Sequence, residues 1–304
     1  MEFTVEANPN TFDAERAAAL AAGGVNRISF GAQSFVASEL ATLQRDHDPE
    51  SVGPAVEMAR AAGITNFNID LIFGIPGQTL ETLHHSLDRA LELGPRHMSV
   101  YSLIYEPNTA MTARLKRGEF VAMEEELELA MFDAVDGRLR GAVPGADLFR
   151  YEISNHAAAG FECAHNVHYW KGGNWLAWGP GAAGHIGVAG AGNWRWKNVA
   201  SLAHYMDALA GPRPALPWTG MEHLEAGAWA AEVATFWLRL AGGLAYGEFT
   251  ERTGVDARGG LERVLRKYEE LGLVTLTERG AGLTAAAIPV SNRIFSDVLA
   301  SFTR

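Results

Sequence analysis

The sequence has little cysteine, no excess of basic residues and no long hydrophobic run. Its 304 residues include one cysteine, Cys163, which excludes an internal disulfide and a metal or iron–sulfur site built from thiolates alone. Lysine and arginine number 25 against 36 aspartates and glutamates, and the resulting net charge of −11 argues against nucleic acid as a partner. Charge or glycine interrupts every long apolar stretch, and residues 1–8 have no signal-peptide pattern. We therefore predict a cytoplasmic protein.

The composition is that of a globular protein, with 48% hydrophobic and 20% charged residues. The first 120 residues alternate short strand-like runs with amphipathic helical stretches, an order typical of βαβ units around a parallel sheet. The predicted fold class is therefore α/β. The predicted strands are residues 3–6, 27–30, 68–72 and 97–103, and the predicted helices are residues 13–22, 50–62 and 79–93.

The first predicted strand begins at the third residue. Parallel sheets normally bury both faces and protect their edges, so this start suggests that earlier βα units are missing. An open four-stranded sheet is the alternative, and chain length does not exclude it.

The second half is less regular at first. A Glu-rich helix is predicted over residues 123–140, and the Gly- and Ala-rich residues 172–192 are predicted to form a long loop. Four tryptophans in and beyond this loop are predicted to be core residues rather than cofactor contacts: Trp175, Trp178, Trp194 and Trp196.

After Pro217 the pattern becomes helical and resembles a winged-helix module. Helices are predicted over residues 222–240, 246–253, 261–271 and 289–302, with short strands at 273–276 and 282–285. Positive and negative charges between Glu251 and Glu270 are equal in number, so this stretch has no basic patch that would indicate DNA binding. We divide the chain into a partial barrel (1–120), a connecting helix with a Gly/Trp-rich region (121–215) and the C-terminal module (216–304).

Polar residues lie at the ends of the predicted strands, where parallel sheets place ligand sites. Glu6 ends the first strand, Gln33 follows the second and Asp70 lies inside the third. Arg45 could hold a carboxylate with its planar fork of donors. The alternative for each carboxylate is a cap or loop anchor, and for Arg45 a surface ion pair.

Together, these segments resemble the radical S-adenosylmethionine (SAM) proteins that are similar to oxygen-independent coproporphyrinogen III oxidase. The resemblance rests on residues 2–9, 24–35 and 70–79, which are similar to strands three to five of that family. It continues through residues 151–155 (Tyr-Glu-Ile-Ser-Asn) and 165–170 (His-Asn-Val-His-Tyr-Trp) into the C-terminal module. Several long motifs in the correct order make the resemblance specific.

The resemblance implies an incomplete (βα)6 radical-SAM barrel with the winged-helix-like module. It also implies that Glu6, Gln33, Arg45, Asp70 and Ile104 line the SAM site. In this interpretation Arg45 holds the methionine carboxylate and Ile104 contacts the adenine. The other three side chains hydrogen-bond the ribose hydroxyls and the amino group.

The His-Asn-x-x-Tyr-Trp motif is typical of the haem chaperone branch of this family. The oxidase branch has a different segment, containing Met-Asp-His, where this chain has residues 151–155. The resemblance implies that His165, Tyr169 and Trp170 contact haem and that the protein passes haem to acceptors, including membrane-associated ones. Imidazole binds haem iron, and aromatic rings pack on the porphyrin. A hydrogen-bonded structural role for His165 is the alternative.

The chain departs from the family in one respect. Members hold a [4Fe–4S] cluster with a Cys-x3-Cys-x2-Cys loop, and this sequence has no such loop. We interpret it as an N-terminally truncated member rather than one that has lost radical chemistry. Coproporphyrinogen III oxidation is the competing function. A cluster-independent barrel hydrolase that uses Glu6, Asp70 and a nearby histidine ranks last, because the sequence has no metal-ligand spacing.

Overall fold

The computed structural model describes residues 1–140, 147–188, 192–210, 216–256 and 258–302. The chain forms two compact units, Met1–Cys163 and Ala164–Arg304, and each is described by itself. Within the described residues, every helix is too short or too polar to cross a lipid bilayer.

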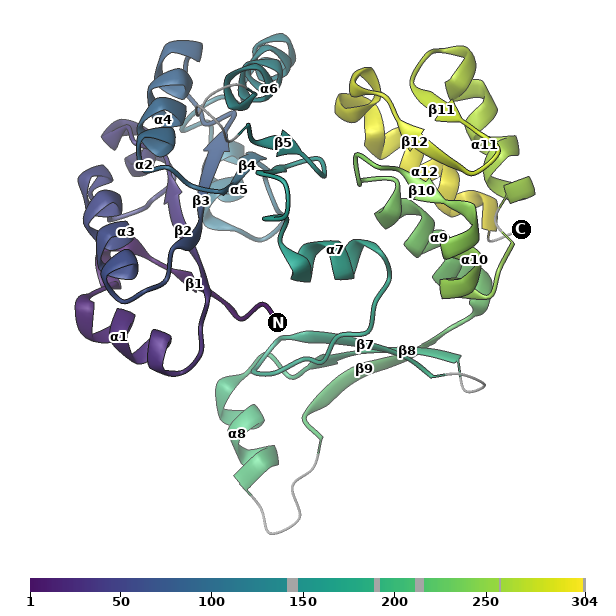
Figure 1. Cartoon of the computed structure of the whole chain (residues 1–304), viewed down its shortest axis with the longest axis horizontal. Helices are drawn as coiled ribbons and strands as arrows, with labels where there is room; N and C mark the ends of the chain where they lie inside the picture. Colours follow the sequence, from purple (N-terminus) through teal and green to yellow (C-terminus); the bar gives the residue numbers. More distant parts are fainter. Residues whose placement is uncertain (141–146, 189–191, 211–215, 257, 303–304) are drawn as a thin grey trace. The chain divides into compact units, whose positions relative to one another are not determined.

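The first unit contains a six-stranded sheet in the order β1-β2-β3-β4-β6-β5 (Figure 1). Neighbouring strands from β1 to β4 are parallel, and β6 and β5 are antiparallel to their neighbours. The strands are β1 (Thr4–Ala7), β2 (Arg27–Gln33), β3 (Asn66–Phe73), β4 (His97–Ser102), β5 (Phe149–Arg150) and β6 (Asn155–Ala157). The helices are α1 (Ala14–Ala22), α2 (Ala37–Thr42), α3 (Val52–Ala61), α4 (Leu80–Glu92), α5 (Ala110–Lys116) and α6 (Glu125–Leu139), with 3-10 turns η1 (Pro9–Thr11) and η2 (Pro49–Ser51).

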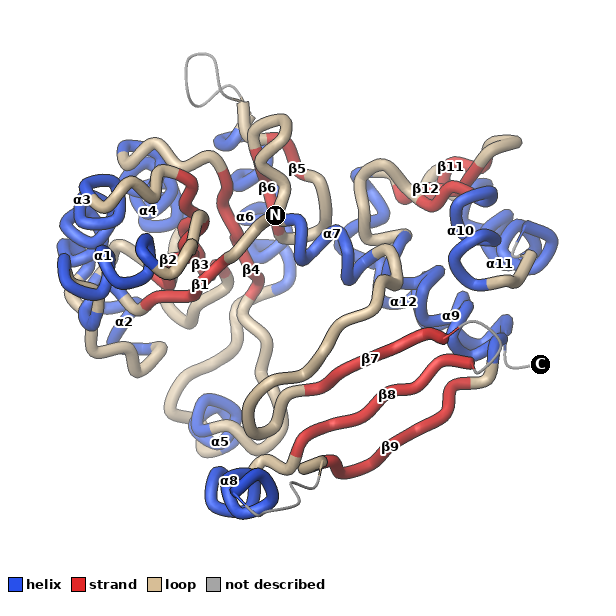
Figure 2. The backbone as a smooth tube through the Cα atoms, turned by 60° about the horizontal axis from the view of Figure 1, so that its bottom comes forward, coloured by secondary structure: helices blue, strands red, loops and turns tan. Residues whose placement is uncertain are grey.

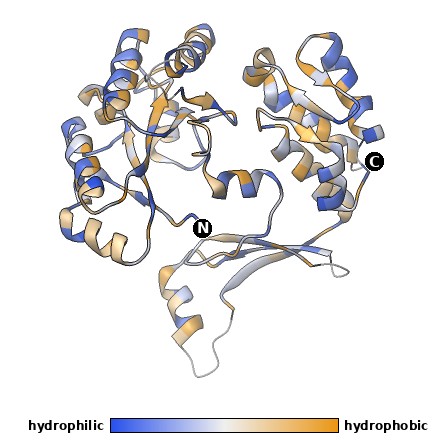
Figure 3. Cartoon of the chain, viewed as in Figure 1, coloured by the Kyte–Doolittle hydropathy of each residue, from blue (hydrophilic) through white to orange (hydrophobic). Residues whose placement is uncertain are grey.

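The two faces of this sheet differ in chemistry. Side chains alternate along a strand, so Phe30 and Ile69 lie on one face and Ser29 and Asn68 on the other. The first face is apolar and packs with α1, α3, α4 and α6 into a buried core, and β3 is strongly hydrophobic (Figure 3). The second face carries polar side chains from neighbouring strands, and these form the first candidate site.

The predicted α/β class is confirmed, and each predicted strand and helix of the first 120 residues is present with ends shifted by up to three residues. β1 lies at one edge of the described sheet. Asp13 and Thr79 cap α1 and α4, as their side chains accept hydrogen bonds from the backbone of the first helical turn.

The second unit begins with α7 (Ala164–Trp170), followed by an antiparallel sheet of β7 (Ala183–Val188), β8 (Gly192–Asn198) and β9 (Trp218–Leu224) (Figure 2). The helix α8 (Leu202–Ala210) lies between β8 and β9 in the chain. The predicted long loop over residues 172–192 is therefore wrong at its described C-terminal part. The predicted helix over 222–240 is wrong at its start, since β9 runs to Leu224 and α9 begins at Ala226.

One glycine explains why the β7–β8 hairpin is difficult to predict from the sequence pattern. A Cβ on Gly184 would lie 2.3 Å from a ring atom of Trp196 on the neighbouring strand. Glycine is required there because the ring packs against the backbone of β7. The same glycine lowers the local hydrophobicity and β propensity on which a strand prediction depends.

The remaining chain matches the predicted winged-helix-like module. It contains α9 (Ala226–Trp237), α10 (Tyr246–Thr253), α11 (Arg258–Glu270), the 3-10 helix η3 (Ala285–Val290) and α12 (Ser291–Phe302). A small sheet joins β10 (Leu244–Ala245), β12 (Gly280–Leu283) and β11 (Val274–Leu276). The three-part division of the chain stays a prediction, and residue 215 at its second boundary lies outside the described residues.

Candidate functional sites

The polar face of the first sheet carries a hydrogen-bonded group centred on Asp70. Ser29 Oγ donates to Asp70 Oδ2 at 3.0 Å, and Asn68 Nδ2 donates to Asp70 Oδ1 at 2.7 Å. Asn68 Nδ2 also lies 2.6 Å from Ser29 Oγ. Two neighbouring strands therefore fix both oxygens of the carboxylate.

His97 extends this group on the next strand. Because the Asn68 amide nitrogen faces Asp70, the Asn68 Oδ1 atom faces His97 and accepts from Nδ1 at 2.6 Å. The other ring nitrogen, Nε2, then accepts from the Tyr151 hydroxyl at 2.9 Å. Burial holds the pKa of His97 well below its usual 6.5, and the nearby Arg27 acts in the same direction. His97 is thus a neutral imidazole with a defined tautomer.

The carboxyl group of Asp70 has a raised pKa. Burial is the main cause, and the negative charge of Glu6 adds to it, while hydrogen bonds from Ser99, Ser29 and Asn68 act in the opposite direction. The Glu6 contribution places this exposed β1 side chain near Asp70, in agreement with the pairing of Glu6 with Ser29 on β2.

Gln33 also lies on this face. Its backbone has a φ of +64°, in the left-handed region, at a register shift between Gly31 and Gln33. Its Nε2 atom lies 2.9 Å from the position a Cβ would take on Gly31, which pairs with Asp70. The structure therefore brings Glu6, Gln33 and Asp70 together.

Arg45 and Ile104 lie in loops beyond the carboxyl ends of the strands. Arg45 is exposed, and its loop is anchored where His47 Nε2 bonds the Ala32 carbonyl of β2 at 2.8 Å. Ile104 follows β4 and is 71% exposed. Arg114 on α5 donates to the Thr42 carbonyl at 2.7 Å, which joins the two loop regions. These contacts support a location of both loops at the carboxyl end of the sheet. They include no direct contact between Arg45 and Asp70.

A buried group organises the same end of the sheet. Ser34 Oγ and Gln78 Nε2 both donate to Glu39 Oε2, at 2.6 and 3.0 Å. Ser86 Oγ accepts from the Phe35 backbone at 3.1 Å. Glu39 is not among the predicted site residues, although a glutamate inside an otherwise hydrophobic segment is a usable signal because a buried carboxylate needs partners.

The residues present do not fit an iron–sulfur cluster. The one cysteine, Cys163, is buried, and its Sγ donates to Glu2 Oε1 at 3.4 Å. No three His, Cys, Asp or Glu side chains gather as a metal site in the part of the chain that the structure describes.

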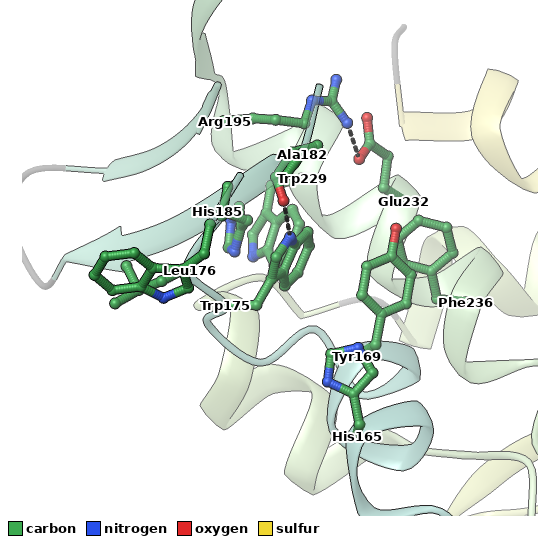
Figure 4. A pocket seen from close by; sticks show the side chains of 13 residues that line it. His165, Tyr169, Trp175, Leu176, Ala182, His185, Arg195, Trp229, Glu232 and Phe236 are labelled. Carbon is green, nitrogen blue, oxygen red and sulfur yellow. Dashed lines mark hydrogen bonds and ion pairs between the residues drawn. The ribbon is translucent and has the colours of Figure 1, made fainter. Parts of the chain in front are cut away.

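The second candidate site is an aromatic pocket of about 480 Å³ in the second unit (Figure 4). Its walls come from α7, the 175–178 segment, the strands β7 and β8, and α9. Its aromatic and charged lining residues are His165, Tyr169, Trp175, Trp178, His185, Arg195, Trp229, Glu232 and Phe236.

The predicted haem motif contributes two residues to this pocket. His165 and Tyr169 line it, and the Tyr169 ring lies 4.6 Å from Trp175 and 5.4 Å from Phe236 between centroids. Trp170 does not line it and instead packs on Phe236, with Arg239 4.5 Å above its ring.

The prediction that the four tryptophans are core residues is confirmed only for Trp196, which is buried. Trp175 and Trp178 line the pocket, with Trp178 82% exposed, and Trp194 is half-buried. Sequence alone could not separate them, since a tryptophan beside glycines fits a packed turn and a pocket wall equally well.

His185 also lines the pocket and is not among the predicted site residues. Its buried ring stacks on Trp229, with centroids 3.9 Å apart and planes 17° apart. The Trp175 ring lies 4.8 Å from the His185 ring between centroids. Burial lowers the pKa of His185, so the wall formed by these rings is uncharged at neutral pH.

Protein-family models match a segment in each of the two units. Residues 1–90 match the Radical SAM superfamily and residues 230–290 match the HemN C-terminal domain. A solved structure titled "Coproporphyrinogen III oxidase (HemN) from Escherichia coli is a Radical SAM enzyme" has a TM-score of 0.77 at 22% identity, covering 98% of this chain and 69% of that chain. The fold is thus that of the radical SAM class.

Curated relatives define the family more closely. The chain is 35% identical to "Heme chaperone HemW" of Bacillus subtilis, over 98% of this chain and 76% of that protein. It is 38% identical to the Mycobacterium tuberculosis (strain ATCC 25618 / H37Rv) protein of the same name, over 94% of this chain and 70% of that protein. The chain belongs to the HemW haem chaperone family. The predicted branch is confirmed, and the oxidase is a structural relative that shows the fold alone.

Proposed function

We propose that this protein binds haem in the aromatic pocket of its second unit and passes it to acceptor proteins. The observation that carries the proposal is that one pocket collects His165 and Tyr169 of the predicted motif with Trp175, Trp229 and Phe236. Flat aromatic walls suit a porphyrin, and an imidazole suits its iron. The name of the HemW relatives supports haem as the cargo.

We further propose that the polar face of the first sheet is a SAM site. Glu6, Gln33 and Asp70 offer the acceptors and amide that ribose hydroxyls and an amino group require, and the loops beyond the strands bring Arg45 and Ile104 to the same end. When bound, SAM would supply a sulfonium that can be cleaved reductively. The [4Fe–4S] cluster expected in the family has no ligand set here, so no step is assigned to it.

Haem titration tests the main proposal. Addition of ferric haem is expected to shift its Soret band and quench tryptophan fluorescence, because all eight tryptophans lie at or beyond Trp170. His165→Ala should weaken binding, whereas His204→Ala, on the exposed surface of α8, should not. A parent protein with intact circular dichroism and no Soret shift would overturn the proposal.

Transfer is tested with the haem-loaded protein and an apo-globin as probe acceptor. We expect the acceptor spectrum to appear faster than from free haem aggregates. A loaded protein that retains its haem in the presence of excess acceptor would support binding and contradict transfer. A cytoplasmic location and membrane-associated acceptors remain part of the proposal.

A further inference from the structure

Arg195 on β8 gives the aromatic pocket one polar end. Among the described residues lining the pocket, it is the only lysine or arginine. Its Nη1 donates to Glu232 at 2.8 Å (Figure 4), and its Nη2 donates to Glu222 at 2.8 Å. Glu232 lines the pocket with Arg195, whereas Glu222 is not one of the lining residues.

The guanidinium is accessible and has unused donors. The Arg195 side chain is 37% exposed, and the third contact, from Nε to the same Glu222 oxygen, is long at 3.3 Å. An arginine has five N–H donors, so a further carboxylate can be received without breaking both ion pairs. The strand pairing of β8 with β7 and β9 fixes the backbone that carries it.

Haem is amphiphilic, with a flat apolar macrocycle and two propionate carboxylates at one edge. We propose, resting on haem as the cargo, that Arg195 binds a propionate of the porphyrin and that Glu232 competes for the same guanidinium. The aromatic wall then holds the macrocycle, and the Arg195 end sets which edge of it faces β8.

The Tyr169 hydroxyl belongs to the same polar end. Burial raises its pKa, the charge of Glu232 raises it further, and the charge of Arg195 lowers it, so both charged groups lie near the ring of the motif tyrosine. The Tyr169 ring is therefore part of the aromatic wall, and its hydroxyl lies at the end of the pocket that holds the Arg195–Glu232 ion pair.

The competing glutamate fits a carrier that must release its cargo. Arg195 carries one positive charge against the two negative charges of Glu222 and Glu232, so a propionate enters a region that already has an excess of negative charge. Its binding is weakened accordingly, and on departure Glu232 takes back the guanidinium. A free arginine would bind the propionate more tightly and release it more slowly.

The test compares ferric protoporphyrin IX with its dimethyl ester, which lacks both charged propionates. Binding is followed by tryptophan quenching and the Soret band. Arg195→Gln should weaken haem binding about tenfold, as expected for loss of a charge-assisted pair, and leave the ester unchanged. Arg195→Lys should give an intermediate loss, because it retains the charge without the fork. Glu232→Gln should tighten haem binding severalfold and slow its release.

Glu225→Gln is the matched control, since it removes the same charge from an 88% exposed side chain in the same unit. Unchanged binding of the ester shows that a variant is folded. Equal effects of Arg195→Gln on haem and ester, or no effect on either, would overturn the propionate assignment. If neither compound binds the folded parent, the proposed haem function itself fails.

Discussion

At the scale of single residues, the neutral state of His97 makes stability depend on pH. A histidine in the unfolded chain has a pKa of about 6.5 and takes up a proton below that pH. Buried His97 takes up its proton only at a lower pH, because burial lowers its pKa. The unfolded chain then binds one more proton at this residue, so the contribution of His97 to stability is fully present above its unfolded pKa and falls as the pH drops below about 6.5.

We expect the His97→Gln variant to lose less stability than the parent between pH 6.5 and 5, by up to about 1.4 kcal/mol per pH unit. Urea unfolding followed by far-UV circular dichroism is the measurement, because the first unit contains no tryptophan. His204→Gln, at an exposed position, is the control and should follow the parent. Parallel pH profiles for parent and His97→Gln would contradict a neutral buried His97.

Gln33 gives a second prediction at this scale, because its φ of +64° is unfavourable for a residue with a side chain. Gln33→Gly should stabilise the protein by about 0.5–1 kcal/mol, after the entropic cost of glycine in the unfolded chain is subtracted. Gln44, with a φ of +55°, is exposed and outside the predicted SAM residues. Gln44→Gly should show a similar gain in thermal unfolding, and a loss of stability in both variants would refute the strain argument.

Individual residues also show which parts of the two candidate sites could be predicted from the sequence. Glu6, Gln33 and Asp70 could be predicted to lie close together, because the ends of adjacent parallel strands share one sheet edge. His185 and Arg195 could not, since they reach the pocket through a hairpin that the pattern did not predict. Arg195 and Glu232 are 37 residues apart, and no local spacing relates them.

At the scale of elements, the β7–β8 hairpin depends on the close approach of Gly184 and Trp196. Gly184→Ala should destabilise the second unit by about 1–3 kcal/mol, because the added methyl group meets the ring at 2.3 Å and the ring must move. Tryptophan fluorescence during urea unfolding reports on this unit. Gly247→Ala, on α10 with nothing within 4 Å of the added atom, is the control and should not destabilise it.

Failure of Gly184→Ala to lower the unfolding midpoint would show that the Trp196 ring has room to shift.

The elements of the first unit could be predicted more closely than the β7–β9 sheet of the second, and the reason is physical. Helices of the first unit have strong end signals, such as the Thr79 capping box of α4, and could be predicted closely. The β7–β9 sheet is rich in glycine and polar residues, and of its three described strands only β8 pairs with a strand on each side. Its strand pairing, above all that of β8 with β9, is set by contacts that are distant in sequence.

At the scale of the whole molecule, the two proposed ligand sites lie in different compact units, so their cofactor requirements can be separated. Every aromatic wall residue of the pocket comes from the second unit, and the one cysteine of the chain lies at the end of the first. Haem binding by the pocket should therefore not require an iron–sulfur cluster.

We predict that anaerobic reconstitution with iron and sulfide yields no [4Fe–4S] cluster on this chain, because one thiolate cannot replace the several cysteines that hold such a cluster. Iron and sulfide analysis after desalting, with the visible absorption spectrum, is the measurement. The same sample should bind haem with unchanged affinity, and Cys163→Ser should alter neither result. About four iron and four sulfide per chain would refute the first expectation. A haem affinity that changes with reconstitution would show that the pocket depends on the metal chemistry of the first unit.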